Sequence, residues 1–196
     1  MELKKHKESH DEYRRRRIIR DRYNATFTSY NELYRLEQFE KYSYVIPKYN
    51  PQGIILDDGC GTALLLEYIW ARKTLFPNAI KYYLCLDISP GMLLEASKTI
   101  TRLGIDYLVD LVEADSENLP LRAKSVDIVY SFTVFMLLDH PLQGIREAKR
   151  VARRYVIYSI LKNIPKLSIE NMGKYMGETS KDQIFVIDFS QKKLRT

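Results

Sequence analysis

The sequence predicts an α/β fold, a doubly wound and mostly parallel sheet with a helical N-terminal extension. From Gly53 onward, short apolar runs alternate with amphipathic stretches. The apolar runs are continuous, as expected for strands that are buried on both faces. Repeated strand–helix pairs indicate βαβ units with right-handed crossovers. The 196 residues, of which 45% are hydrophobic, are enough for one core of this kind.

The periodicity places each element along the chain. Strands are expected at residues 54–57, 82–87, 107–114, 126–131 and 155–160. Helices are expected between them, at residues 63–72, 91–103 and 142–149. A helix at about 166–176 and a strand at 183–189 follow. Ligands of such sheets bind outside the carboxyl ends of the strands, so one crevice should gather residues 57–62, 87–89, 115–117 and 131–133.

Residues 1–50 are predicted to form a basic helical extension or lid, and residues 51–196 the main domain. Ser9 with Glu12 forms a capping box for a first helix through the arginine run. Asn31 is the expected cap of a second helix, which ends before Pro47. Apolar residues recur at helical spacing along this second helix, so it should pack on another element.

The charge is unevenly distributed. The formal net charge is +6 and the pI is near 9.1. Residues 1–22 hold nine basic and five acidic side chains, and a second basic cluster comprises Lys149, Arg150, Arg153 and Arg154. Such clusters attract polyanions such as RNA, although a solvated face is the alternative interpretation. The charged composition with 15 tyrosines also favours a thermophilic source.

Cysteine use and hydropathy predict the cellular setting. Cys60 and Cys85 are the two cysteines, and neither a CxxC motif nor a Cys/His cluster is present. No disulfide framework and no metal site are therefore expected. No window is apolar enough to span a bilayer, and the N-terminus lacks a secretory apolar region. We expect a cytoplasmic protein.

A glycine turn after the first strand, "ILDDGCGTA", indicates a ligand site. Gly59 and Gly61 match the first pair of the dinucleotide fingerprint, but Leu64 occupies its third position. Asp57 and Asp58 precede the turn, and each carboxylate near a pyrophosphate would cost about 1–4 kcal/mol. A phosphate-bearing ligand is therefore disfavoured. S-adenosylmethionine carries an ammonium and a sulfonium group and no phosphate, so it suits an anionic crevice.

This interpretation predicts a role for each polar strand end. Asp57 would anchor the ammonium group, directly or through water. The backbone from Gly59 to Gly61 would approach the methionyl chain, because glycine has no Cβ. Asp87 would accept hydrogen bonds from both ribose hydroxyls, and Asp115 from the adenine amine.

The remaining predicted contacts complete the cofactor site. Ile88 and Met92 would sandwich the adenine ring. Ser131, Phe132 and Thr133 would line the acceptor side at the end of the fourth strand. Further members of the predicted site are Cys60, Thr62, Ser116 and Glu117.

Four motifs in order carry a family resemblance: the glycine turn, "CLDISPGMLLEASK", "EADSENLPLRAKSVDIVYS" and "FTVFMLLDHP". Together, over residues 53–160, they resemble class I SAM-dependent methyltransferases. The nearest match is the type 11 group, which includes ubiquinone- and menaquinone-biosynthesis C-methyltransferases and tRNA-modifying relatives. The resemblance implies a Rossmann-like fold, and lid roles for Tyr23 and Tyr30.

The chain departs from the family pattern at several points. Ala63 stands where a glycine is usual, and Asp58 where an apolar residue is usual. Ala63 is small enough that cofactor binding should survive, whereas Asp58 has two open orientations, toward the crevice or toward solvent. The family sheet ends in two antiparallel strands, of which only residues 183–189 are evident, so six or seven strands are expected.

The predicted activity is methyl transfer by in-line displacement (EC 2.1.1.-), which leaves S-adenosylhomocysteine. Because the leaving group is good, positioning and exclusion of water are the main requirements, and no catalytic triad is expected. His140 and Tyr30 are the candidate catalytic residues. The alternative for His140 is capping of the next helix, and Cys60 is better explained as a small residue that fills the turn than as a nucleophile.

Three acceptor hypotheses follow. The basic N-terminal segment favours RNA or an RNA-associated protein. The tyrosine-rich helices favour instead a quinone-type small molecule in an apolar pocket. The third possibility is a SAM-binding subunit that needs a protein partner at the apolar edge strand, residues 107–114. The absence of a [DN]-P-P-[YF] signature lowers the odds of adenine-N6 or guanine-N2 methylation.

Overall fold

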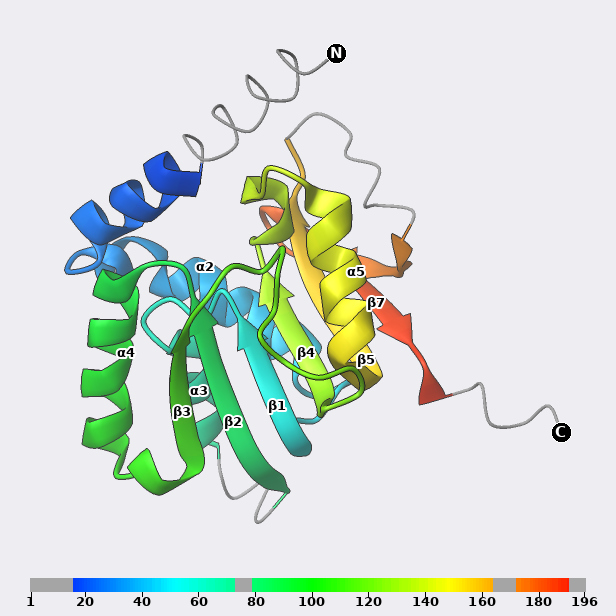
Figure 1. Ribbon diagram of the computed structural model, residues 1–196, viewed down its shortest axis with the longest axis horizontal. Helices are drawn as coiled ribbons and strands as arrows, with labels where there is room; N and C mark the ends of the chain where they lie inside the picture. Colours follow the sequence, from blue (N-terminus) through cyan, green and yellow to red (C-terminus); the bar gives the residue numbers. More distant parts are fainter. Residues whose placement is uncertain (1–15, 73–78, 164–171, 191–196) are drawn as a thin grey trace, which may run out of the picture.

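The computed structural model describes residues 16–72, 79–163 and 172–190. A seven-stranded sheet with the order β3-β2-β1-β4-β5-β7-β6 forms its centre (Figure 1). Strands β1 to β5 pair in parallel, and β7 and β6 follow antiparallel. The strands are β1 Gly53–Asp58, β2 Ile80–Asp87, β3 Val109–Glu113, β4 Val126–Phe132, β5 Ala152–Leu161, β6 Lys174–Glu178 and β7 Asp182–Asp188. The predicted doubly wound, mostly parallel sheet is confirmed, with the higher of the two expected strand numbers.

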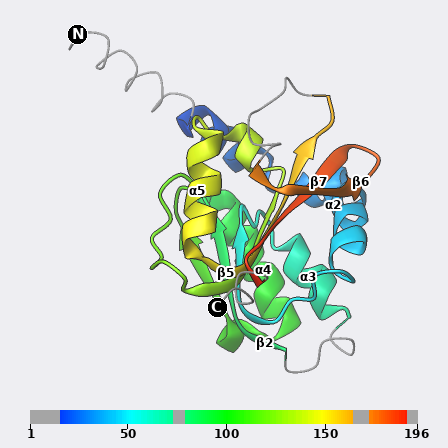
Figure 2. The ribbon, with the colours of Figure 1, turned by 90° about the vertical axis from the view of Figure 1, so that its right-hand side faces the viewer.

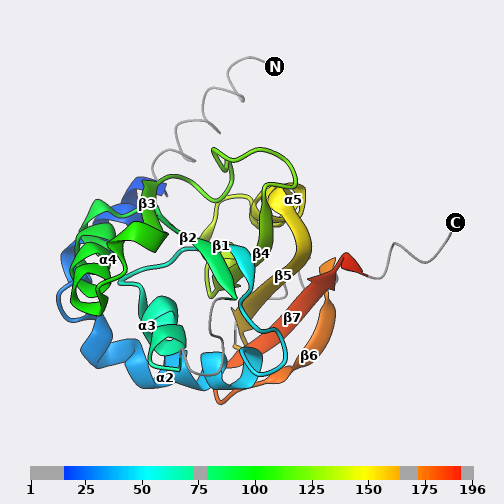
Figure 3. The ribbon, with the colours of Figure 1, turned by 90° about the horizontal axis from the view of Figure 1, so that it is seen from below.

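Helices cover both faces of the sheet. They are α2 Tyr30–Val45, α3 Leu64–Trp70, α4 Pro90–Leu103 and α5 Pro141–Val151, with 3-10 turns at Asp106–Leu108 and Phe135–Leu137. Residues 16–26 form a further helix, called here the N-terminal helix. Figures 2 and 3 show α2 and α3 on one face and α5 on the other. The two hydrophobic clusters follow this division, since Ile55 joins the α2–α3–α4 side and its neighbour Leu56 the α5 side.

Local sequence signals explain where α4 begins and ends. Ser89 is its N-cap and accepts a hydrogen bond from the Met92 backbone N–H at 3.2 Å. Pro90 occupies the first turn, where its missing N–H is not needed. Gly104 ends the helix in the left-handed conformation, φ 67°. The helix therefore starts directly after Asp87 at the end of β2, which positions that carboxylate.

The order of the strands creates the crevice. The chain runs outward from β1 through β2 to β3, then returns to β4 on the other side of β1. The connections that leave β1 and β4 therefore run to opposite sides, and a crevice forms outside the carboxyl ends of these two strands. The N-terminal helix lies at this end of the sheet (Figure 1).

Two of the sequence predictions about helices need correction. Of the helix expected at about 166–176, residues 166–171 lie outside the described residues, and Lys174–Glu178 form strand β6 instead. Pairing with β7 and the packing of Tyr175 against Phe185, with ring centroids 5.8 Å apart, outweigh the local helical preference. The N-cap of α2 is Ser29 rather than Asn31.

The capping box at Ser9 and Glu12 also lies outside the described residues. Within the described parts of the chain, no helix is long and apolar enough to cross a membrane.

Candidate cofactor and acceptor site

A cavity of about 540 Å³ lies at the carboxyl ends of β1, β2, β3 and β4. The N-terminal helix and α2 form its outer wall, and most of the predicted cofactor-binding residues line it. These residues are Gly59, Gly61, Asp87, Ile88, Met92, Asp115, Ser116, Glu117, Thr133, Tyr23 and Tyr30. The structure thus brings together residues from four strand ends and from the extension.

The glycine turn needs both of its glycines. Gly59 and Gly61 have φ values of 78° and 55°, which side chains rarely adopt. A Cβ on Gly59 would lie 2.2 Å from Val134 Cγ2, so packing also requires glycine there. At Gly61 the nearest atom to such a Cβ would be Tyr30 Cε1, at 3.9 Å. The Tyr30 ring therefore covers the turn from the α2 side.

Asp87 is held by backbone groups and still faces the cavity. One carboxylate oxygen accepts from the Gly61 N–H and the other from the Ser89 N–H, both at 2.9 Å. Burial raises the pKa of Asp87, and these N–H donors act in the opposite direction. A carboxylate has about four lone-pair sites, so the Asp87 carboxylate keeps capacity for a ribose hydroxyl. This arrangement fits the predicted ribose contact.

Three carboxylates at the end of the cavity where adenine is expected contact one arginine of the N-terminal helix. Arg16 lies 3.0 Å from Asp115, 2.6 Å from Glu117 and 3.5 Å from Asp139. Burial would lower the pKa of Arg16, but the three carboxylates outweigh it and raise that pKa. The clamp joins the extension to the segment after β3 and closes this end of the cavity.

A second contact attaches the N-terminal helix beside Asp87. Asn24 Oδ1 accepts hydrogen bonds from Ser89 Oγ at 2.6 Å and from the Gly91 N–H at 3.0 Å. A Cβ on Gly91 would lie 3.0 Å from both Asn24 Oδ1 and Phe27 Cδ1. Close docking of the helix therefore depends on the missing side chain at position 91.

Asp57 and Asp58 lie beneath the cavity rather than in its lining. Their side chains point to opposite faces of the sheet and are 3% and 0% exposed. Asp57 accepts a hydrogen bond from the Tyr83 hydroxyl at 2.9 Å, and Asp58 accepts from Ser116 at 2.6 Å and Ser131 at 3.4 Å. Burial raises the pKa of each aspartate to about 7. The ammonium contact of Asp57 stays a prediction, and Asp58 faces the protein interior.

Four other predicted residues are placed outside the cavity lining. Cys60 is a buried free thiol, Thr62 donates to Asn31, and Ser131 is fully buried beside Asp58. His140 is the N-cap residue of α5, and its backbone N–H donates to Glu117 at 2.9 Å. His140 therefore lies outside the cavity lining, and its catalytic role stays a prediction.

Of the two catalytic candidates, Tyr30 does line the cavity. Burial raises the pKa of its hydroxyl, so this phenol stays neutral at physiological pH. Its hydroxyl accepts a hydrogen bond from Gln38 Nε2 at 3.4 Å. Whether Tyr30 takes part in the chemistry stays a prediction.

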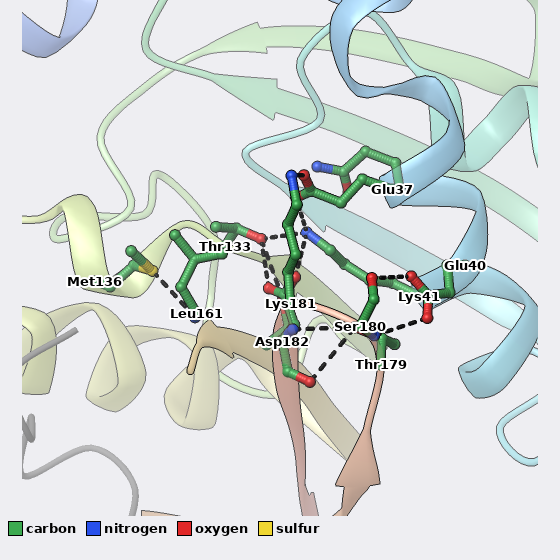
Figure 4. A network of polar contacts seen from close by, with 12 residues as sticks. Glu37, Glu40, Lys41, Thr133, Met136, Leu161, Thr179, Ser180, Lys181 and Asp182 are labelled. Atoms are coloured by element: carbon green, nitrogen blue, oxygen red, sulfur yellow. Dashed lines mark hydrogen bonds and ion pairs between the residues drawn. The ribbon is translucent and has the colours of Figure 1, made fainter. Parts of the chain in front are cut away.

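A polar network joins α2 to the β6–β7 turn at the acceptor side (Figure 4). Lys41 is fully buried, and its Nζ lies 3.0 Å from Asp182, 3.2 Å from Glu37 and 2.7 Å from Thr133 Oγ1. Lys181 contacts the other Glu37 oxygen at 2.9 Å. Burial would raise the pKa of Glu37, but the two lysines outweigh this and lower it. The network holds Thr133, which has a left-handed backbone (φ 63°), at the cavity wall.

The end of the cavity beside Thr133, where the acceptor is expected, is mainly apolar. Its side chains come from α2, from the segment after β4 and from the end of β5. They are Leu33, Val134, Met136, Leu137, Leu138 and Leu161. Glu37 and Lys181 stand beside them as the charged residues of this wall.

Several site residues had no detectable signal in the sequence. Arg16, Asn24, Gln38, Lys41 and Asp139 act through contacts with distant segments. Arg16 and Glu117, for example, are 101 positions apart. The basic run that contains Arg16 and the amphipathic pattern of α2 do not indicate which side chains point toward the cavity.

The donor set fits S-adenosylmethionine. Asp87 offers free lone pairs to a ribose, Ile88 and Met92 offer apolar contacts to adenine, and the turn at Gly59 and Gly61 leaves room for a chain. The carboxylates around the cavity disfavour a diphosphate. Fold and site together define a class I methyltransferase.

Comparison with known proteins identifies the family. A family model described as "Methyltransferase domain" matches residues 56–158, more than half of the chain. The chain belongs to this family, the SAM-dependent methyltransferases of the type 11 group, and S-adenosylmethionine is its cofactor.

One curated relative is the "Malonyl-[acyl-carrier protein] O-methyltransferase" of Marinomonas sp. (strain MWYL1). It is 31% identical over 152 residues, which cover 76% of this chain and 53% of the relative. The chain therefore spans about half the length of that relative.

Two solved structures show the same fold. Magnesium protoporphyrin IX methyltransferase from Synechocystis PCC 6803, with bound SAM, has a TM-score of 0.66 at 16% identity, over 88% of this chain and 95% of that chain. The putative methyltransferase in a complex with the Trm112 methyltransferase activator from Haloferax volcanii has a TM-score of 0.61 at 17% identity, over 70% and 59%.

Asp87→Ala is expected to weaken S-adenosylmethionine binding by about 1–3 kcal/mol, because charge-assisted hydrogen bonds to the ribose are lost. Isothermal titration calorimetry measures the affinity, and thermal melting checks the fold. Asp106→Ala, at an exposed position, is the control. Unchanged affinity in Asp87→Ala would contradict the ribose contact.

Asp58→Asn is expected to stabilise the protein more at pH 8 than at pH 4. The folded-state pKa is about 7, above the unfolded value near 4, so the folded protein retains a proton that the unfolded chain releases. The contribution of Asp58 to stability is therefore present at low pH and falls as the pH rises from about 4 to about 7. Asparagine does not titrate, so the variant should avoid this loss, which is on the order of 1–3 kcal/mol in the free energy of unfolding. Urea unfolding at pH 4, 6 and 8 tests it, and a pH-independent effect would argue against the raised pKa.

Lys41→Met is expected to lower the free energy of unfolding by about 3–5 kcal/mol, because Asp182 and Glu37 lose their buried counter-charge. The double variant Lys41→Met/Asp182→Asn should recover part of this loss, since it leaves one carboxylate fewer uncompensated. Urea unfolding of both variants measures the difference. A double variant less stable than Lys41→Met would show that the buried charge is not the cause.

Proposed function

We propose that this methyltransferase acts on a small molecule whose apolar part occupies the acceptor end of the cavity. The observation that carries the proposal is the apolar lining at that end, between α2, the segment after β4 and Leu161. Apolar side chains with a few polar groups are typical of small-molecule sites. This was the alternative hypothesis from the sequence, and the structure favours it over an RNA acceptor.

The residues of the chain act mainly by positioning. S-adenosylmethionine supplies an electrophilic methyl group on a positively charged sulfur. The N-terminal helix and α2 cover the crevice and exclude water from it. Thr133, held by Lys41, shapes the wall at the end of β4, where the acceptor must align with the donor.

A second candidate is O-methylation of a carboxylate carried on a protein. The named activity of the Marinomonas relative suggests it. The specific observation in its favour is Lys181, which lines the cavity with its side chain 62% exposed. An ammonium at this position is suitable for pairing with an acceptor carboxylate that displaces Glu37.

The RNA acceptor stays a prediction with less support. Of the basic N-terminal segment, residues 1–15 lie outside the described residues, and Arg16 is turned inward to three carboxylates. The second cluster lies at the end of α5 and the start of β5, and the parallel strands place it at the opposite end of the sheet from the cavity. Arg150 and Arg153 are also engaged there, with Glu147 and with the Lys124 carbonyl.

A partner at the edge strand is a further proposal. β3 is the outer strand of the sheet, and Leu111 on it is 37% exposed. An unpaired edge of this kind can accept a strand from another chain. A stable, fully active monomer would count against this idea.

Leu161→Trp is expected to reduce methyl transfer at least about tenfold, because the larger ring fills the acceptor end, while S-adenosylhomocysteine affinity changes less than about twofold. Labelled S-adenosylmethionine is incubated with RNA, protein and small-metabolite fractions of a cell extract. Leu94→Trp, at an exposed position on α4, is the control. Labelling confined to RNA, and unaffected by Leu161→Trp, would overturn the small-molecule proposal.

A further inference from the structure

Gln38 holds a buried polar atom in the wall of the cavity. Its residue is 6% exposed and lines the cavity from α2. The side-chain Nε2 donates to the Tyr30 hydroxyl at 3.4 Å, whereas Oε1 has no hydrogen-bond partner. A buried carbonyl oxygen without a donor destabilises a protein, so an atom of this kind in a cavity wall calls for a ligand that supplies the donor.

The carboxylates that line the cavity already have partners. Arg16 holds Asp115, Glu117 and Asp139, as described above. Glu37 is shared between Lys41 and Lys181. The Asp87 oxygens accept from backbone N–H groups and face the predicted ribose position. Asp139 Oδ2 makes no hydrogen bond either, but it lies 3.5 Å from Arg16 Nε. Among the described side chains of the cavity wall, Gln38 Oε1 is therefore the buried acceptor with neither a hydrogen bond nor an ion pair.

The position of Gln38 relates it to the glycine turn. Tyr30, Tyr34 and Gln38 follow one another at four-residue spacing, so they share one face of α2. The Tyr30 ring lies over Gly61, and its hydroxyl contacts the Gln38 amide. The amide thus belongs to the same part of the wall as the turn that is expected to hold the methionyl chain. Asp57, the residue predicted to hold the ammonium group, accepts a hydrogen bond from Tyr83 below that wall.

We propose that Gln38 Oε1 accepts a hydrogen bond from the α-ammonium group of S-adenosylmethionine. An ammonium group has three N–H donors and no acceptor, so it can supply the hydrogen bond that the Gln38 carbonyl oxygen lacks. A neutral amide at this place also needs no counter-charge when the cavity is empty, unlike a buried carboxylate. The proposal rests on S-adenosylmethionine as the cofactor and does not depend on the acceptor.

Calorimetry with two ligands tests the contact. S-adenosylhomocysteine carries the ammonium group, whereas 5′-methylthioadenosine keeps the nucleoside and the sulfur but lacks the amino-acid part. Gln38→Leu should weaken S-adenosylhomocysteine binding about tenfold, as expected for a hydrogen bond to a charged group. Binding of 5′-methylthioadenosine should change less than about twofold. Gln143→Leu, on α5 and outside the cavity lining, is the matched control.

Stability separates a ligand contact from a structural role. Without ligand, Gln38→Leu should melt at the wild-type temperature or above it, because an apolar side chain replaces a buried unpaired oxygen. A lower melting temperature together with equal weakening of both ligands would show that Gln38 only maintains the lid, and would overturn the proposal. Unchanged affinity for S-adenosylhomocysteine would overturn it as well.

Gln38→Glu identifies the group that is bound. A carboxylate can only accept at neutral pH, so this variant should bind S-adenosylhomocysteine at pH 8 at least as tightly as the wild type does. Strong weakening in Gln38→Glu as well as in Gln38→Leu would mean that the amide N–H donates to the methionyl carboxylate, and would overturn the ammonium contact. A wild-type protein that binds neither ligand would instead refute the cofactor assignment, an outcome visible without any variant.

Discussion

The cavity depends on opposite charges, partly buried at Arg16 and fully buried at Lys41, that hold the N-terminal extension over the carboxyl edge of the sheet. Arg16 joins the N-terminal helix to Asp115, Glu117 and Asp139, and Lys41 joins α2 to Asp182. The sheet alone would leave an open crevice at β1 and β4. With both contacts made, the crevice becomes a covered cavity whose walls come from five or more separate segments. Buried charges tolerate the loss of a partner poorly, so the Lys41–Asp182 pair also restricts how α2 can dock.

The electrostatic character of the cavity differs from a simple anionic cradle. Arg16 offsets the carboxylates on the adenine side, and two lysines offset Glu37. Burial raises the pKa of Asp57 and Asp58 to about 7, so near neutral pH they are not fully ionised. Many carboxylates in a small volume cannot all remain charged without counter-charges. Recognition of a cation therefore relies on hydrogen-bond acceptors that point toward it as well as on net negative charge.

The acceptor end follows from how α2 meets the β6–β7 turn. Glu37 and Lys41 on α2 contact Lys181 and Asp182 at the start of β7. The residues of β6 were expected in a helix, and the pairing with β7 decided otherwise. That antiparallel pair brings the turn to the cavity wall. A local helical preference is worth a few tenths of a kcal/mol per residue, which strand pairing and packing of Tyr175 on Phe185 readily exceed.

The sequence by itself determined the fold class, the succession of strands and the polar residues at the strand ends. The apolar run before Asp57 predicts a buried strand, and the glycines at 59 and 61 predict a tight turn. Both predictions are possible because these structures depend on residues that are neighbours in the chain. Only the tertiary structure decided which oxygens reach the cavity: Asp57 lies beneath it and Gln38 within its wall. It also decided that Arg16 turns inward rather than toward a polyanion. These outcomes depend on contacts between segments far apart in the chain, and no local pattern encodes the direction of a single side chain.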